Sequence, residues 1–391
     1  MPDATPIPLT TDFVHLHVHS MYSLLGAVPT PKELAAAAKA DGQDALAITD
    51  AGALYGAIDF YQACRNQDIK PIIGLDAYLA PRTRHDKEHP IDRPRSRVVL
   101  LAKTFAGYQN LIKLVTLSNT EGAYYKPRLD DELLTQYKDD LICIIPSFAG
   151  EVAQALKDSL PERAAERLDF YKNTFGEDCY LEISHHPEIF GHEETQTKIK
   201  ALAAQTNTPL VAAHDVYYLK PTDRLARETM IKIGTGGVVD TSSDHEGAED
   251  FSFKTQAEMK EWFADTPEAI TNTVKIANEC NVEITLGMDA WVFPDFIIAS
   301  GREPDDELTV TAWEGVVWRG LDPTNPELKQ RLDFELDVIK MKGYAKYFLV
   351  VGDLLRESRD RGILTTIRGS VAGSLTTYVL GITNVNPLEY R

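Results

Sequence analysis

The residues with the clearest chemical potential are a histidine run near the N-terminus, His15-Leu16-His17-Val18-His19. The run closes the first apolar segment, which predicts that it lies at the end of a strand. Residues i and i+2 of a strand share a face, so His17 and His19 should point the same way. Two imidazoles on one face suit zinc or manganese. A purely structural role explains the same pair, so both interpretations stay open at this point.

Acids and imidazoles recur at the ends of later apolar segments. They are Asp50, Asp76, Glu182, His185, His186, His214 and Asp215. A metal site built on a barrel or sheet needs such side chains at neighbouring strand ends. The alternative is a polar mouth held by hydrogen bonds. The pattern supports at least one bound ion as well as it supports that alternative.

A second feature with chemical potential is the turn Arg368-Gly369-Ser370-Val371-Ala372-Gly373-Ser374. Small residues let backbone amides approach a phosphate, and a helix starting at Ala372 would add its positive end. Ser370 and Ser374 can donate hydrogen bonds, and Arg368 can pair with phosphate oxygens. Tight packing explains many such turns, so the turn alone is weak evidence.

Short apolar runs alternate with amphipathic helices over the first 220 residues. This alternation is expected to position the histidines and acids at the strand ends. The seven strand candidates are 13–18, 45–49, 71–79, 97–102, 141–146, 179–184 and 209–213. Helices are expected at 31–42, 55–66, 108–118, 161–175 and 193–206. Such alternation predicts a parallel α/β sheet, either open or closed into a barrel.

The remaining chain predicts further helices and a second domain. Helices are expected at 255–263, 267–278, 328–341 and 348–361, and an interdomain linker at 293–308. The boundary is placed near Gly287, which gives domains of residues 1–286 and 287–391. The acids Asp305, Asp306 and Glu307 are expected in the solvated linker.

Composition narrows the class of protein. The chain has 391 residues and a net charge of −19, so it lacks the overall basic footprint of a nucleic-acid binder. The segment 329–391 differs, with ten Lys and Arg against seven Asp and Glu. No apolar run is long enough to span a membrane, so a cytoplasmic location is expected. The four scattered cysteines are expected to be buried free thiols.

Several motifs resemble one family, the bacterial DNA polymerase III alpha subunits. They are FVHLHVHSMYSLL, ALAITD, IKPIIGLDAY, LLAKTFAGYQNL, NTVKIANECNVEI, GYAKYFLVVGD and RGSVAGSLTTYVLGITNVNPL, in the order of the family. The resemblance implies a distorted seven-stranded (β/α) PHP (polymerase and histidinol phosphatase) barrel. It also implies that the first part of a polymerase beta-like palm follows the barrel.

The resemblance also implies a ligand set. His17 and His19 match the opening pair, Asp76 stands where a bridging Glu is usual, and Asp215 matches a late Asp. Five other positions depart from the family pattern: Gly26 for Asp, Ala51 for His, Arg97 for His, Ser147 for Cys and Tyr217 for His. Because these five positions have changed, we expect at most one weakly held Zn²⁺ or Mn²⁺. Hydrolysis of a phosphodiester usually needs two or three ions, so we also expect no exonuclease or phosphatase activity.

In the palm, Arg368, Gly369, Ser370, Gly373 and Ser374 match the family motif that holds the incoming triphosphate. Thr366-Ile367 replace the usual Pro-Gly, which predicts a reshaped turn. The family's catalytic aspartates, which bind Mg²⁺, lie downstream, so these 391 residues are expected not to polymerise.

The implied partners of the full protein are primer–template DNA, deoxynucleoside triphosphates and a sliding clamp, clamp loader or proofreading subunit. Two alternatives stay open. One is a metal-dependent phosphoesterase of the PHP superfamily, and the other is a non-catalytic replisome scaffold.

Overall fold

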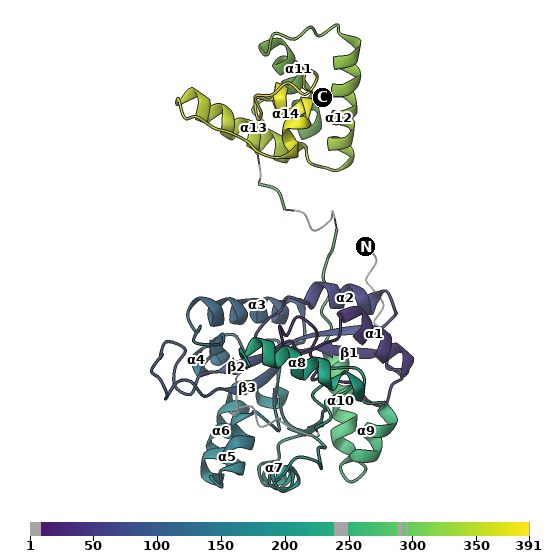
Figure 1. Cartoon of the computed structure of the whole chain (residues 1–391), viewed down its shortest axis with the longest axis vertical. Coiled ribbons are helices and arrows are strands. Elements are labelled where there is room, and N and C mark those ends of the chain that lie inside the picture. Colours follow the sequence, from purple (N-terminus) through teal and green to yellow (C-terminus); the bar gives the residue numbers. More distant parts are fainter. Residues whose placement is uncertain (1–8, 238–248, 288–291, 295, 391) are drawn as a thin grey trace. The chain divides into compact units, whose positions relative to one another are not determined.

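The computed structural model describes residues 9–237, 249–287, 292–294 and 296–390. The chain divides into two compact units, residues 1–284 and 285–391 (Figure 1). Each unit has its own hydrophobic core. No helix in the described residues is long and apolar enough to cross a membrane.

The first unit is built on one curled sheet of seven strands. The strands are β1 (Ala45–Ile48), β2 (Lys70–Leu79), β3 (Ser96–Ala102), β4 (Arg128–Leu129), β5 (Leu141–Ile145), β6 (Cys179–Ile183) and β7 (Leu210–Ala212). Their order is β1-β2-β3-β5-β6-β7, and the short β4 pairs with β2 off this path. Six of these strands were predicted from the alternation, whereas β4 was not.

The sheet is mixed, so the expectation of a parallel sheet is wrong at one strand. β3 runs antiparallel to both β2 and β5, whereas all other pairs are parallel. The reason lies in the connection between β2 and β3, residues 80–95, which contains no helix. A parallel return needs a crossover of a dozen or more residues that usually holds a helix, so the chain returns antiparallel here.

The first predicted strand, 13–18, is an extended segment rather than a regular strand. The Ala47 amide donates to the His15 carbonyl at 3.0 Å, and Thr49 to Val18 at 2.7 Å. On its other side, Val18 forms a parallel bridge with Val216, just beyond β7. The segment therefore joins the two edges of the curled sheet, which makes the fold a distorted, partly closed barrel.

Helices cover the outside of this barrel (Figure 1). They are α1 (Pro31–Ala40), α2 (Ala57–Arg65), α3 (Phe105–Thr120), α4 (Asp131–Gln136), α5 (Glu151–Lys157), α6 (Pro161–Phe175), α7 (His192–Thr206), α8 (Arg224–Gly234), α9 (Gln256–Trp262) and α10 (Pro267–Glu279). The sequence signals are local: Thr30 and Glu33 form the capping box that begins α1. Three helices, α4, α5 and α8, were not predicted.

Alternate residues of each strand form two separate layers of core. Ile73 and Leu100 pack in the layer that includes the helices, whereas Ile72 and Leu101 pack inside the barrel. Side chains alternate between the two faces of a strand, so Asp76 follows Ile72 on the inner face. The middle of the barrel interior is thus apolar, and acidic side chains such as Asp76 lie at one end of it.

The second unit contains helices and no strand in its described residues. It contains α11 (Pro304–Trp318), α12 (Pro326–Met341), α13 (Ala345–Asp360), a 3₁₀ turn (Ser370–Gly373) and α14 (Leu375–Val379). The expectation that Asp305, Asp306 and Glu307 lie in a linker is wrong, because they form the first turn of α11. Acids favour that position because they complement the positive end of the helix dipole.

Candidate metal centre

The predicted histidines and acids meet at the mouth of the barrel. The Asp76 Oδ2 atom lies 2.9 Å from the Nε2 atom of His19 and 3.3 Å from that of His17. All three side chains are buried. They form one group of possible ligand atoms, all within 4.8 Å of one another.

A second group of possible ligands shares His17. Its Nδ1 atom lies 2.8 Å from Glu182 Oε2 and 2.9 Å from Asp215 Oδ1. Burial opposes protonation of His17, but the charges of Asp215 and Glu182 outweigh it and raise the pKa of the imidazole well above its usual value. The two carboxylates therefore favour the protonated form of His17.

Glu182 was not among the predicted ligands, although it had been noted at a strand end. It lies on β6 two residues after Tyr180, whose side chain packs inside the barrel. Because alternate side chains of a strand share a face, Glu182 lies on the inner face together with Tyr180. This alternation was the feature of the sequence that could have indicated Glu182 as a ligand.

Arg97 holds Asp76 from the neighbouring strand. Its Nε donates to Asp76 Oδ1 at 2.9 Å, and its Nη2 forms an ion pair with Oδ2. Burial opposes ionisation of Asp76, but the Arg97 charge and hydrogen bonds from the two histidines hold the pKa of that carboxyl well below its usual range. Both oxygens of the expected bridging ligand are therefore engaged by a fixed cation.

A stack of planar groups adjoins this ion pair. His19 stacks on the Tyr217 ring at 4.1 Å with an interplanar angle of 5°. The Arg227 guanidinium of α8 lies 3.9 Å from the centroid of the same ring, and its Nε donates to the Gly26 carbonyl at 3.0 Å. Burial lowers the pKa of His19 to about 4, so this imidazole is neutral at pH 7.

The positions that depart from the family pattern surround this cluster. Ser147 donates through its amide and hydroxyl to Glu182 Oε1, at 2.9 and 3.0 Å. Ala51 forms a bridge with Asp76, and Arg97 lies 3.4 Å from the Tyr217 hydroxyl. Protein hydrogen bonds and an arginine therefore satisfy carboxylates that would otherwise face cations.

The other polar strand ends do not join the cluster. Asp50 accepts hydrogen bonds from the Ser20 amide and from Ser20 and Ser23 hydroxyls at 2.6–2.8 Å, and burial raises its pKa to about 6. His186 stacks on His214 at 4.7 Å in a separate aromatic cluster. Neither group belongs to the possible metal ligands found among the described residues.

The two groups of possible ligands differ in whether an arginine contacts them. A cation beside Asp76 would compete with Arg97 for both carboxylate oxygens. The group of His17, Glu182 and Asp215 contains no arginine, but a metal there needs neutral His17, because a protonated imidazole nitrogen is not a ligand. One imidazole and two carboxylates suit a single Zn²⁺ or Mn²⁺.

The glycine-rich turn differs from its expectation. The helix begins at Leu375 rather than Ala372 and has five residues. Glu335 of α12 accepts hydrogen bonds from Ser374 Oγ at 2.7 Å and from the amides of Leu375 and Thr376 at 3.0 and 2.9 Å. A carboxylate of the protein thus takes donors that were expected to face a phosphate.

The other expected phosphate ligands lie at the surface. Arg368, Gly369 and Ser370 are exposed, and Gly369 has a φ of +93°, which a side chain would disfavour. Gly373 accepts a hydrogen bond from Arg331 at 2.9 Å through its carbonyl. The turn is therefore accessible at its arginine end and closed by Glu335 at its helix end.

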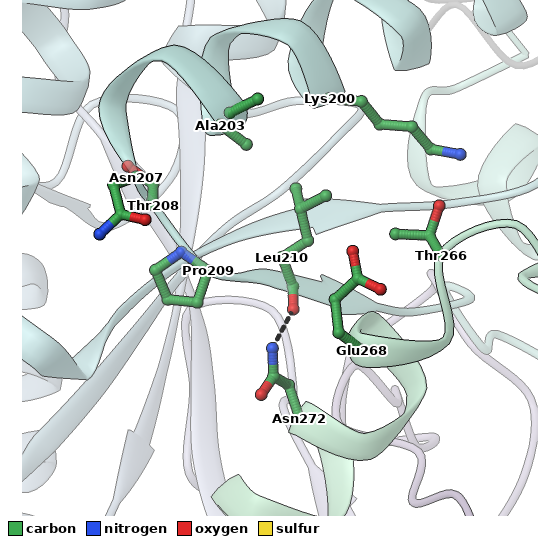
Figure 2. A pocket seen from close by; sticks show the side chains of 10 residues that line it. Lys200, Ala203, Asn207, Thr208, Pro209, Leu210, Thr266, Glu268 and Asn272 are labelled. Carbon is green, nitrogen blue, oxygen red and sulfur yellow. Dashed lines mark hydrogen bonds between the residues drawn. The ribbon is translucent and has the colours of Figure 1, made fainter.

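A separate cavity of about 560 Å³ lies between α7, the start of β7 and α10 (Figure 2). Asn272 donates to the Leu210 carbonyl at 2.7 Å across its floor, and Lys200 and Glu268 line its walls. Leu210 begins β7 whereas Asp215 follows its end. The cavity is thus at the opposite end of β7 from the candidate metal centre.

Comparison with known proteins agrees with the barrel and its histidine motif. Residues 15–186 match the family model described as PHP domain. Residues 306–391 match the model described as bacterial DNA polymerase III alpha NTPase domain. The chain is therefore a relative of the bacterial DNA polymerase III alpha subunits.

Individual relatives extend this match to nearly the whole chain. The DNA polymerase III alpha subunits of Treponema pallidum, Borreliella burgdorferi and Bacillus subtilis are 36, 35 and 35% identical to it over 97% of its length. The chain covers 32–33% of these proteins, so it spans about a third of their length. Among solved structures, an amidohydrolase from Chromobacterium violaceum is 14% identical over 52% of this chain and 87% of its own, with a TM-score of 0.35.

Proposed function

We propose that this chain is the N-terminal part of a replicative DNA-directed DNA polymerase whose PHP domain does not hydrolyse phosphodiesters. The observation that supports the absence of hydrolysis is the ion pair between Arg97 and the buried Asp76. Arg97 places a permanent positive charge on the carboxylate that would bridge two metal ions. A guanidinium stays protonated at any physiological pH, so it does not yield to a metal as a histidine would.

The barrel mouth consequently lacks the means for metal-assisted hydrolysis. That chemistry needs one ion to generate hydroxide and usually another to neutralise the leaving oxygen. Of the predicted ligands His17, His19, Asp76 and Asp215, His17 and Asp215 belong together with Glu182 to the group without an arginine. This group would hold at most one Zn²⁺ or Mn²⁺, weakly. When bound, a single ion would supply charge neutralisation at the mouth, and the chain's own residues would orient it there.

Metal analysis combined with a nuclease assay tests this proposal. The wild-type chain, dialysed against Mn²⁺ or Zn²⁺, should retain no more than one ion and should not degrade a labelled single strand. Arg97→His restores the family residue and should raise metal retention, whereas Arg163→His, on the exposed face of α6, should leave it unchanged. Two or more ions in the wild type with exonuclease turnover would refute the proposal.

For the whole protein we propose polymerisation with Mg²⁺ on primer–template DNA and deoxynucleoside triphosphates. The match over 306–391 and the turn at Arg368 support this assignment, with residues 287–391 as the first part of the palm. In this proposal the PHP domain, residues 1–286, serves in the cytoplasm as a scaffold for a sliding clamp, clamp loader or proofreading subunit. The self-neutralised barrel mouth favours this scaffold role over the alternative of a metal-dependent phosphoesterase.

Titration with a deoxynucleoside triphosphate tests the nucleotide part separately. Arg368→Ala should weaken binding of the triphosphate, whereas Arg356→Ala, on α13, should not. Equal binding by both variants and the wild type would remove the turn from the nucleotide site without affecting the proposal for the barrel.

A further inference from the structure

A surface of alternating tyrosines and cations lies beside β2 and the short turn before β4. It consists of Tyr78, Arg93, Arg95, Tyr125 and Lys126, and is called here the Tyr78 patch. The Arg95 guanidinium and the Lys126 ammonium each lie 5.9 Å from the centroid of the Tyr78 ring. The Arg93 guanidinium lies 5.9 Å from the centroid of Tyr125. Each cation of the patch is thus next to an aromatic face.

The cations of the Tyr78 patch are not neutralised by acids. Among the described residues, no carboxylate forms an ion pair with Arg93, Arg95 or Lys126. The other arginines of the same loop differ, because Arg82 pairs with Asp92 and Glu88, and Arg84 with Glu121, Asp130 and Glu132. In a chain with a net charge of −19, three neighbouring unpaired cations favour an anionic partner.

Tyr125 is held outward by its backbone. Its side chain is 67% exposed, and its φ of +60° lies in the left-handed region that residues with side chains rarely adopt. Tyr124 and Lys126 bridge across it, and the Tyr124 ring supports it edge-on, with centroids 4.7 Å apart. A large aromatic ring in this conformation is unfavourable unless surrounding contacts fix it, and functional sites are where such conformations gather.

We propose that the Tyr78 patch binds single-stranded nucleic acid. A base would stack on the exposed ring of Tyr125, while Arg93, Arg95 and Lys126 would contact the neighbouring phosphates. Stacking platforms flanked by cations are the usual means of binding single strands without sequence preference. Double-stranded DNA could contact the cations through its phosphates, but it has no unpaired base to stack on Tyr125. An acidic peptide could contact the cations but has no base. Both are therefore less suitable ligands than a single strand. The inference goes beyond the proposed function, since it requires neither polymerisation nor an intact palm.

Fluorescence anisotropy of the full 391-residue chain with a labelled 15-residue oligothymidylate tests the proposal. At low salt the strand should bind, and Tyr125→Ala should weaken binding about tenfold, as expected for the loss of one stacked base. Tyr125→Phe should bind as the wild type does. Tyr55→Ala is the matched control, because Tyr55 is 62% exposed in the same unit and forms no cation–π contact among the described residues.

The salt dependence of binding separates stacking from phosphate contacts. Arg93→Ala should reduce the slope of log K against log salt by about 0.7, the value for one phosphate contact on a single strand. Arg163→Ala should not change that slope. Retained binding by Tyr125→Ala at the wild-type level, equal binding of a 15-base-pair duplex, or equal competition by polyglutamate would each overturn the proposal. Absence of binding at low salt would do the same.

Discussion

At the scale of single residues, one guanidinium decides the chemistry of the barrel mouth. Asp76 meets His17 and His19 as a metal ligand would, yet Arg97 engages both of its carboxylate oxygens. Removal of one partner of a buried ion pair usually costs about 3–5 kcal/mol, because the other charge stays buried without compensation. The pair therefore supports the fold, and in the proposed function it also opposes the binding of a second ion.

Arg97→Ala should lower the free energy of unfolding of the first unit by about 3–5 kcal/mol. Added Zn²⁺ or Mn²⁺ should recover part of this loss, because the variant exposes Asp76 and two imidazoles to a cation. Urea unfolding with and without metal measures both effects. Arg84→Ala removes another arginine paired with a buried acid, Asp130, and should be destabilised without recovery by metal. Equal recovery in both variants would contradict the role given to Asp76.

At the scale of elements, one side chain of α12 organises the start of α14. Glu335 accepts hydrogen bonds from two amides and from Ser374 Oγ, and forms an ion pair with Arg331 at 2.6 Å. Burial opposes ionisation of Glu335, but the hydrogen bonds outweigh it and lower its pKa. A five-residue helix has little stability of its own, so this tertiary cap supports it.

Glu335→Gln should destabilise the second unit by about 1–3 kcal/mol at pH 7, the usual contribution of hydrogen bonds to a charged group. The folded pKa of Glu335 lies below its unfolded value, 4.5. Its contribution is therefore complete above about pH 4.5 and is lost as the pH falls through the folded pKa. Unfolding measured from pH 3 to pH 7 should show a shallower loss of stability in Glu335→Gln than in the wild type. Asp337→Asn, an exposed change on the same helix, should keep the wild-type slope, and an identical slope in Glu335→Gln would contradict the cap.

At the scale of the whole molecule, two cores serve two units. The first core lies inside and around the curled sheet, and the second joins α11 to α14. The division falls at residue 284, and the described residues 9–237 and 249–284 supply all members of the first core. Each unit therefore has a core made of its own residues.

Leu101→Ala should destabilise the first unit by about 2–5 kcal/mol and leave the second unchanged, because Leu101 is fully buried inside the barrel. Leu332→Ala should do the reverse, since Leu332 is fully buried in the second core. Differential scanning calorimetry should show one transition moving in each variant. A single transition that shifts equally in both would show that the units unfold together.

The sequence by itself determined the elements whose signals are local. The apolar runs predicted six strands, and the capping box at Thr30 placed the start of α1. The spacing of His17 and His19 put both imidazoles toward Asp76. These features follow from periodicity and capping, which act over a few residues.

Only the tertiary structure decided which groups satisfy one another. The antiparallel β3 follows from a connection without a helix, and the pairing of Arg97 with Asp76 follows from the register of β3 against β2. Glu182 and Glu335 reach their partners across 35 to 165 residues of chain, a separation that no local pattern encodes. The sequence indicated candidate ligands for a metal and for a phosphate. Long-range packing determined that Arg97 pairs with one of these ligands, Asp76, and that Glu335 accepts hydrogen bonds from the start of α14.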